Sequence, residues 1–283
     1  MELSEGHYFI TFVEKQRGIM KIAIIGAGNM GGAIACGLAA SGKYKAGEIL
    51  CANPSVGKLD ALKLRYDIIL TTTDNCAAAK DADMVVVAVK PWLAEGVVKE
   101  IKSAFNTPHK MLVSVVADVK FATLREWVAD VENQPAIFRV IPNTAISVGE
   151  SMTFVSADGA TEEQTDAVME IFASMGEAML VSEKILEVGM ILASCGIAFA
   201  FRYVRAAAEA GVELGVPAQQ ATQIVAATLK GAAELLLKNG SHPEQEIDKV
   251  TTAGGITIKG LNEMEHAGFS SAVIRGLKAS AGK

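Results

Sequence analysis

Hydrophobic positions along the first two thirds of the chain form short β-branched runs separated by helix-like segments such as Asn29–Ala40, Val56–Arg65 and Asn75–Lys80. Apolar runs that alternate with helices are typical of a doubly wound parallel sheet that is buried on both faces. This pattern predicts an α/β fold. The predicted strands are Ile22–Ile25, Glu48–Asn53, Ile68–Leu70, Met84–Val89, Met111–Val116, Ile137–Ile141, Met152–Val155 and Ala178–Val181.

The periodicity changes near residue 182, beyond which the sequence holds only long stretches rich in Ala, Leu and Glu. A second, all-helical domain is predicted there. Its segment Val188–Phe201 has 14 residues without a charge, which is too short to span a membrane. A helix that is apolar on every side is buried, and a domain of this size is small for burying it alone. We therefore predict an oligomer interface, with burial inside one subunit as the alternative.

Charge, cysteines and histidines limit which partners and metal sites the chain is expected to have. The net charge of -6 and pI of about 5.4, without a run of Lys and Arg, argue against a nucleic-acid partner. No membrane partner is expected. Four scattered cysteines without a Cys-x-x-Cys predict reduced, mostly buried thiols and a cytoplasmic protein. The four histidines lack metal-ligand spacing, so no metal site is predicted.

A glycine-rich turn follows the first predicted strand. The sequence Gly26-Ala-Gly28-Asn29-Met30-Gly31 stands between that strand and a helix-like segment, which is the context of a dinucleotide-binding turn. Gly26 permits a tight turn, Gly28 lets the backbone approach a pyrophosphate and Gly31 lets the helix pack on the strand. We predict an NAD(P)-binding Rossmann domain at 20–182 and a helical domain at 183–283, after an N-terminal extension at 1–19.

The extension contains an apolar run, Tyr8–Val13. Glu2 and Glu5 stand where a signal peptide carries positive charge, and no small-residue cleavage site follows. A Rossmann domain needs nothing before its first strand. Met20 is therefore interpreted as the natural start.

The end of the second predicted strand carries no acid. A carboxylate there normally holds the ribose 2′-hydroxyl of NAD, whereas this chain has Asn53, Ser55 and nearby Lys58. These residues can donate hydrogen bonds to a 2′-phosphate. NADPH is the favoured cofactor and NADH the alternative. Asn53-Pro54 can also be read as a turn with Ser55 as a helix N-cap, which is compatible with cofactor binding.

A second group of glycines and hydroxyls lies near the end of the chain. Thr251, Thr252, Gly254, Gly255 and Thr257 precede a predicted helix at 262–267. Such a loop offers free backbone N–H groups that can hold a carboxylate. A glycine turn that merely caps a helix has a similar sequence.

These residues, taken together, resemble pyrroline-5-carboxylate reductase. The similarity extends from Met20 to about Ser280 and rests on Gly26–Gly31, Val89–Pro91, Arg139–Thr144, Ala210–Pro217 and Val250–Leu261. It implies a Rossmann domain with a helical dimerisation domain, homodimers often assembled into rings, and NAD(P)H-dependent reduction of 1-pyrroline-5-carboxylate to L-proline, the last step of proline biosynthesis.

The resemblance also implies roles for matched residues. Lys90 and Asn143 match positions beside the nicotinamide, and the hydroxyl of Thr257 matches one near the ring nitrogen of the substrate. Thr257 and Lys90 are the candidate catalytic residues. The candidate cofactor contacts are Gly26, Gly28, Asn29, Met30, Gly31, Asn53, Ser55, Val89, Lys90, Pro91 and Asn143. The candidate substrate contacts are Thr251, Thr252, Gly254, Gly255, Thr257 and Asn143.

Two departures from the family pattern stand out. Many members read Ser-Gly-Ser-Gly-Pro-Ala where this chain reads Ala193-Ser194-Cys195-Gly-Ile-Ala, and Ala253 replaces a usual proline. Ser194 and Cys195 are therefore left out of the candidate site. One alternative function is a related imine or hydroxyacid reductase. Hydroxyacid reductases need a lysine with a nearby asparagine for acid-base catalysis, and no asparagine follows Lys184 in the long helix. The other is a non-catalytic NADP-binding protein of the same fold.

Overall fold

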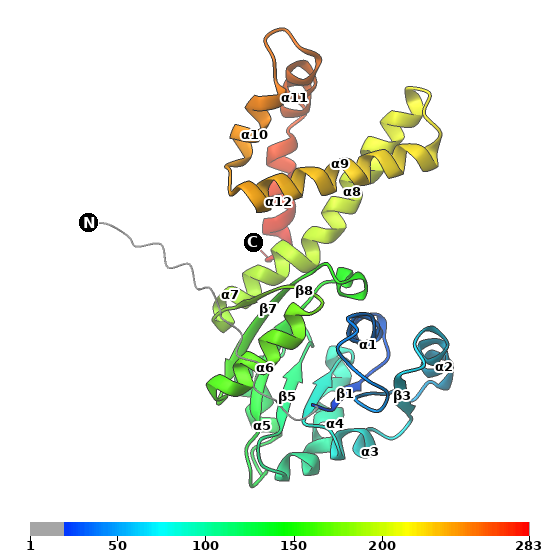
Figure 1. Cartoon of the computed structure of the whole chain (residues 1–283). Coiled ribbons are helices and arrows are strands. Elements are labelled where there is room, and N and C mark those ends of the chain that lie inside the picture. Colours follow the sequence, from blue (N-terminus) through cyan, green and yellow to red (C-terminus); the bar gives the residue numbers. More distant parts are fainter. Residues whose placement is uncertain (1–19, 283) are drawn as a thin grey trace, which may run out of the picture. The chain divides into compact units, whose positions relative to one another are not determined.

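The computed structural model of the protein describes residues 20–282 (Figure 1). The expected extension at 1–19 lies outside these residues. Contacts divide the chain into one unit that ends at Ile137 and another that begins at Phe138. The sheet has eight strands in the order β3-β2-β1-β4-β5-β6-β7-β8, so the predicted Rossmann-type α/β sheet is confirmed.

The unit up to Ile137 is built on parallel strands with crossover helices. β1 pairs with β2 and β4, β2 with β3, and β4 with β5, all in parallel. The strands are β1 (Ile22–Ile25), β2 (Ile49–Ala52), β3 (Ile69–Thr72), β4 (Met84–Val87) and β5 (Met111–Ser114). The helices are α1 (Asn29–Ala40), α2 (Val56–Arg65), α3 (Asn75–Lys80), α4 (Pro91–Ile101), η1 (Lys102–Asn106) and α5 (Phe121–Trp127).

Burial explains why these apolar runs are strands. Every residue of β1, β4 and β5 is buried, as expected for central parallel strands covered by helices on both faces. One hydrophobic cluster joins the strands to the inner faces of α3, α4 and α5, with Ile25, Val87, Phe105 and Leu112 at 0–1% exposure. The sequence pattern therefore predicts this unit well, including the bounds of α1, α2 and α3.

The second unit begins with the remaining strands and then becomes entirely helical. β6 (Ala136–Ile141) crosses the boundary, and it is followed by η2 (Thr144–Val148), β7 (Ser151–Asp158), α6 (Glu162–Ala173) and β8 (Gly176–Leu180). β7 and β8 are parallel, and Thr161 and Gln164 form a capping box at the start of α6.

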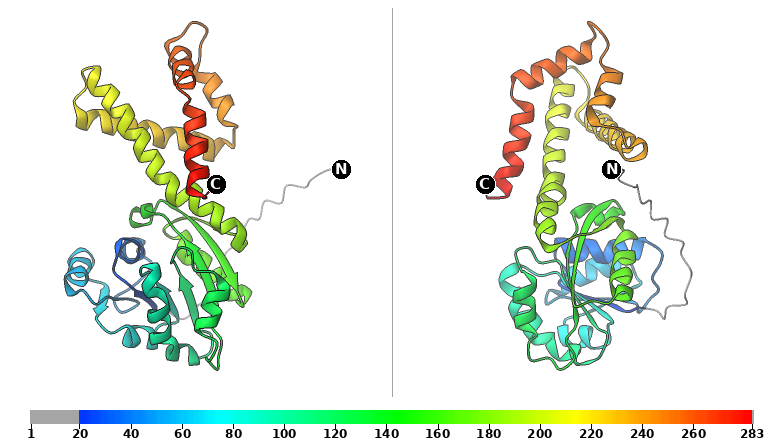
Figure 2. Two further views of the ribbon diagram at one scale, coloured as in Figure 1. Left: turned by 180° about the vertical axis from the view of Figure 1, so that it is seen from behind. Right: turned by 90° about the vertical axis from the view of Figure 1, so that its left-hand side faces the viewer.

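The helices after β8 are α7 (Glu183–Gly189), η3 (Met190–Cys195), α8 (Gly196–Glu213), α9 (Ala218–Asn239), α10 (Pro243–Val250), α11 (Ile256–His266) and α12 (Phe269–Ser280). Within the described residues no strand follows β8, as predicted. α8 packs with α9, and α12 returns to η3 (Figure 2).

Two expectations for the helical region are wrong. The apolar segment 188–201 is part of one continuous helical stretch, Glu183–Glu213, which is long and apolar enough to cross a membrane by length and composition. The alternative of burial entirely within one subunit also fails, since Leu192 and Phe201 are 58% and 63% exposed. The helix expected to start at residue 262 begins six residues earlier, at Ile256.

Candidate functional site

The glycine turn between β1 and α1 is held by two close contacts. Gly26 has a φ of +111°, and a Cβ there would lie 2.6 Å from the Ala88 carbonyl oxygen. A Cβ on Gly31 would lie 1.9 Å from the Gly26 oxygen, so the first turn of α1 rests directly on the loop. Only glycine fits at either position.

Gly28 plays a different part in this turn. It is the N-cap of α1, no side chain caps the helix, and nothing lies within 4 Å of a Cβ built on Gly28. Packing therefore does not require glycine here, and the expected approach of a ligand to this backbone stays a prediction. The first N–H groups of α1 have no side-chain cap, which is the arrangement found at helix N-termini that bind anions. Asn29 is exposed and Met30 is half-buried beside it.

Asn53 lies at the end of β2 and is buried. Its Oδ1 accepts a hydrogen bond from the backbone N–H of Ala27 at 3.1 Å, and its Nδ2 donates to the Ser55 carbonyl at 3.2 Å. The amide thus ties the glycine turn to the loop after β2, a role that the sequence did not suggest. Ser55 is exposed and makes no side-chain capping bond to α2, which leaves its hydroxyl open to a ligand.

The Val89-Lys90-Pro91 segment lies at the same strand edge, because β1 and β4 are adjacent and parallel. Val89 Cγ1 would be 3.0 Å from a Cβ on Gly26, so Val89 packs against the glycine turn. Lys90 is the N-cap of α4 with an exposed side chain, and Pro91 occupies the first turn. β4 itself ends at Val87, two residues before the predicted end.

Asn143 follows β6 and is buried. Its Oδ1 accepts from the Ala145 N–H at 2.9 Å and caps η2, while its own N–H donates to Ser151 Oγ at 3.1 Å. The first bond fixes the side chain and the second fixes the backbone, and the Nδ2 amide group keeps its donors for another partner.

Ser194, which the sequence analysis left out of the candidate site, lies in the π-helix η3. Its Oγ donates to the Pro142 carbonyl at 2.8 Å, across 52 positions of the chain. A second link joins the same helical stretch to β6, where the buried Arg139 forms an ion pair with Glu183 at 2.7 Å. Arg139 Nε is buried without a hydrogen-bond partner. Nothing in the local sequence pattern predicts a π-turn at this point.

The threonine and glycine segment is a short turn into α11. Gly254 has a φ of +70°, and Gly255 is the N-cap of α11, where a Cβ would lie 2.7 Å from Thr252 Oγ1. Thr251 Oγ1 donates to the Ile247 carbonyl at 3.0 Å. Thr257 is exposed in the first turn of a helix that no side chain caps, so a carboxylate would find unpaired N–H groups beside a hydroxyl.

The two buried cysteines, Cys51 in β2 and Cys36 in α1, offer no activated thiol. Burial raises the pKa of Cys51 to about 12, and burial also raises that of Cys36. Cys76 is exposed and Cys195 is half-buried, so fewer thiols are buried than expected. The pKa of Cys76 is raised by desolvation and then by the nearby carboxylates of Glu100 and Asp74.

The structure therefore gives two groups of candidate residues. The first surrounds the carboxyl ends of β1, β2 and β4 and contains Gly26, Gly28, Asn29, Met30, Gly31, Asn53, Ser55, Val89, Lys90 and Pro91. The second belongs to the unit from Phe138 onward and contains Asn143 and the segment 251–257.

Known proteins match both units. Residues 21–118 match a family described as NADP oxidoreductase, coenzyme F420-dependent, and residues 183–283 match pyrroline-5-carboxylate reductase dimerisation. Pyrroline-5-carboxylate reductase 2 of Dictyostelium discoideum is 39% identical over 275 residues, covering 93% of this chain and 91% of that protein. The chain belongs to the pyrroline-5-carboxylate reductase family.

Solved structures of the family have the same fold. The pyrroline carboxylate reductase of Plasmodium falciparum with NADP bound has a TM-score of 0.82 at 27% identity, covering 92% of this chain and 95% of that one. The Coxiella burnetii enzyme has a TM-score of 0.82 at 29% identity, covering 93% and 96%. Membership of this reductase family does not favour the hydroxyacid reductase alternative.

Proposed function

We propose that the protein reduces 1-pyrroline-5-carboxylate to L-proline with NADPH, as the last step of proline biosynthesis in the cytoplasm. The observation that carries this proposal is the uncapped N-terminus of α11, with Thr257 exposed in its first turn. It supplies a carboxylate site and a hydroxyl in a chain that also has a dinucleotide-binding turn.

The cofactor half follows from the first unit. The N–H groups at the start of α1 would hold the pyrophosphate, and the open space at Gly28 would admit it. Asn53 keeps the turn in place through Ala27, and Ser55 and Lys58 donate to the 2′-phosphate. Lys90 and Asn143 are the proposed contacts of the nicotinamide, as the family resemblance implies. No acid stands after β2, which favours NADPH over NADH.

The substrate half needs little acid-base machinery. The α11 N–H groups bind the carboxylate, while the Thr257 hydroxyl holds the ring nitrogen, with Thr251, Thr252, Gly254 and Gly255 shaping the turn. Water would protonate the imine nitrogen, and NADPH, when bound, would supply a hydride to the resulting iminium carbon to give the secondary amine. Catalysis comes from placing the two reactants and steadying the iminium charge.

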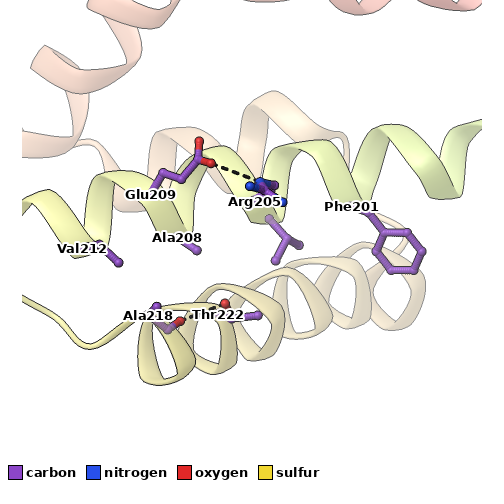
Figure 3. Close-up of a pocket in the computed structure, with 8 residues that line it drawn as sticks. Phe201, Arg205, Ala208, Glu209, Val212, Ala218 and Thr222 are labelled. Atoms are coloured by element: carbon purple, nitrogen blue, oxygen red, sulfur yellow. Dashed lines mark hydrogen bonds and ion pairs between the residues drawn. The ribbon is translucent and has the colours of Figure 1, made fainter.

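We propose a homodimer, and a ring of dimers as its larger assembly, with the helical region as the dimer interface. Within the stretch Glu183–Glu213, only 11% of the apolar 18-residue segment is buried in the chain. The family model that matches this region is described as pyrroline-5-carboxylate reductase dimerisation. A groove of about 470 Å³ runs between α8 and α9 (Figure 3). Its lining is mainly apolar and consists of Phe201, Val204, Arg205, Ala208, Glu209, Val212, Ala218 and Thr222.

A second copy is a better occupant of this surface than a bilayer. Arg205 and Glu209 form an exposed ion pair on α8, within the stretch that a membrane would have to accommodate. At the same helix pair, a Cβ on Gly211 would lie 3.0 Å from the Ala221 Cβ, so α8 and α9 approach closely. Neither a nucleic acid nor a membrane is proposed as a partner.

One assay tests the function. Purified protein is mixed with NADPH or NADH and 1-pyrroline-5-carboxylate, and the nicotinamide absorbance is followed. Turnover with consumption of NADPH is expected. Absence of turnover with both cofactors would overturn the proposal, and NADPH binding without turnover would favour a non-catalytic binding protein. A 3-hydroxyacid with NADP serves as the comparison substrate.

A further inference from the structure

Three contacts attach the long helical stretch to β6, to β7 and to Pro142, the residue that follows β6. Glu183 pairs with the buried Arg139 at 2.7 Å, and Gly189 lies so close to Phe154 that a Cβ would be 2.7 Å from its ring. Ser194 then donates its hydroxyl to the Pro142 carbonyl at 2.8 Å. The first two are an ion pair and an apolar contact, whereas the third reaches the backbone beside Asn143.

The π-helix η3 sets the direction of Ser194. Each residue of an α-helix turns the chain by about 100°, so the extra residue in a π-turn rotates later side chains by about that angle relative to those before it. Met190 and Ala193 still pack on the cluster of Ile141, Phe154 and Leu186. The local turn thus allows the apolar contacts and the Ser194 hydrogen bond to coexist. Such turns occur frequently at functional sites.

The hydrogen bond from Ser194 adds to a set that already fixes Asn143. The side chain of Asn143 caps η2 through Ala145, and its backbone N–H is held by Ser151. Pro142 is the residue immediately before it and has no N–H of its own. The carbonyl of Pro142 shares a peptide plane with the Asn143 nitrogen, so a donor on that oxygen restrains the orientation of the plane.

We infer that Ser194 is a positioning residue, whose hydroxyl holds the Pro142–Asn143 peptide so that the Asn143 amide meets the reacting end of the cofactor. This inference rests on the proposed function. In this inference the π-turn directs the Ser194 hydroxyl toward Pro142, and the helical stretch of the dimerisation region thereby contacts the segment that carries Asn143. Ser194 was excluded from that site because the flanking hydroxyl positions differ from the usual family pattern.

The test compares Ser194→Ala with Ser174→Ala. Ser174 Oγ also donates to a backbone carbonyl, that of Ile171 at 2.6 Å, and is equally part-buried, but it lies at the end of α6. Both variants lose one hydrogen bond of the same kind. Ser194→Thr retains the hydroxyl and serves as the rescue variant. Measurements are kcat, KM for 1-pyrroline-5-carboxylate, Kd for NADPH, and hydrogen exchange of a peptide covering residues 142–148.

Ser194→Ala is expected to lower kcat about tenfold, because a small misplacement of reacting groups slows the chemical step. Its KM and its NADPH Kd should stay within about twofold, since the carboxylate and phosphate contacts lie elsewhere. Exchange of peptide 142–148 should be faster than in the native protein and in Ser174→Ala. Ser194→Thr should recover most of kcat.

Two results would overturn the inference: a kcat for Ser194→Ala equal to that of Ser174→Ala, or unchanged exchange of peptide 142–148. If the native protein shows no turnover, the proposed function fails, and the exchange comparison still decides whether Ser194 restrains this segment. The two failures are therefore distinguishable.

Discussion

The unit up to Ile137 and the helices from α8 onward differ sharply in burial. In the first, Ile22, Ile24 and Val85 are at most 1% exposed, and helices such as α1 and α4 each have a buried face. In the second, α8 and α9 have one buried residue each, Ala208 and Ala221. α10, α11 and α12 have none.

The difference is not one of composition, because the helices also carry large apolar side chains. Phe201 is 63% exposed, Leu237 77% and Ile256 88%. Monomeric proteins rarely leave large apolar areas in water. The first unit thus buries its hydrophobic core within one chain. The helices leave apolar side chains exposed that the proposed second copy would cover.

The largest loss of cofactor affinity is expected at the glycine turn of the first unit, where no extra side-chain atom fits. Gly31→Ala places a Cβ 1.9 Å from the Gly26 oxygen, so the glycine turn must move. We expect the NADPH Kd to rise at least about 100-fold in a fluorescence titration, through misplacement of the turn. Gly32→Ala is the matched control, because its nearest neighbours are 3.9 Å away. Equal affinities for the two variants would contradict this view of the turn.

The helical half is tested by a charge on its apolar surface. Phe201→Glu places a carboxylate in the groove between α8 and α9, where the proposed dimer would have to desolvate it. A monomer mass by light scattering is expected, together with loss of most turnover. Leu64→Glu introduces the same charge at a 93% exposed position of α2 and should leave the mass unchanged. A dimer that survives Phe201→Glu would place the interface elsewhere.

Thr257→Val tests whether the α11 turn serves the substrate while the first unit binds the cofactor. The variant keeps the shape of the side chain and removes its hydroxyl, and one hydrogen bond to a charged group corresponds to roughly 10- to 100-fold in kcat/KM. We expect KM for the imine to rise and kcat to fall in steady-state kinetics, with the NADPH Kd unchanged. Thr257→Ser should behave nearly as the native protein. An equal loss of NADPH affinity would show that the α11 turn does not serve the substrate.

The smallest effect is expected at Asn53. Asn53→Asp can still accept from the Ala27 N–H, but it sets an oxygen against the Ser55 carbonyl and repels a 2′-phosphate. The NADPH Kd should rise about tenfold and the NADH Kd less, in parallel titrations. Asn53→Ala removes both hydrogen bonds without adding charge and should weaken the two cofactors alike. An unchanged NADPH to NADH ratio in Asn53→Asp would refute the electrostatic account.

The first unit was also the easier one to predict. Its strands are continuous apolar runs, and the bounds of α1, α2 and α3 follow from the residues that flank them. The glycine positions are equally readable, because Gly26 and Gly31 are required by backbone contacts that any such turn makes. Local sequence suffices where the chain completes its own core.

The helical half was harder for identifiable reasons. The start of α11 was missed because Ile256, Thr257 and Ile258 are β-branched and Gly260 follows, all of them weak helix formers. The π-turn at 190–195 depends on long-range contacts with β6 and β7, which have no local signal. The tie from Asn53 to Ala27 likewise joins positions 26 residues apart.

The exposed apolar stretch Glu183–Glu213 also bears on how the protein folds. A newly made sheet unit can reach its native state by a first-order process, since its contacts lie within one chain. The helices reach theirs only when two chains of the proposed dimer meet, so their half of the molecule folds by a second-order step. Dilution then destabilises these helices, because it shifts the equilibrium toward separate chains. The apparent stability of the helical region therefore depends on the concentration of the protein in the cell.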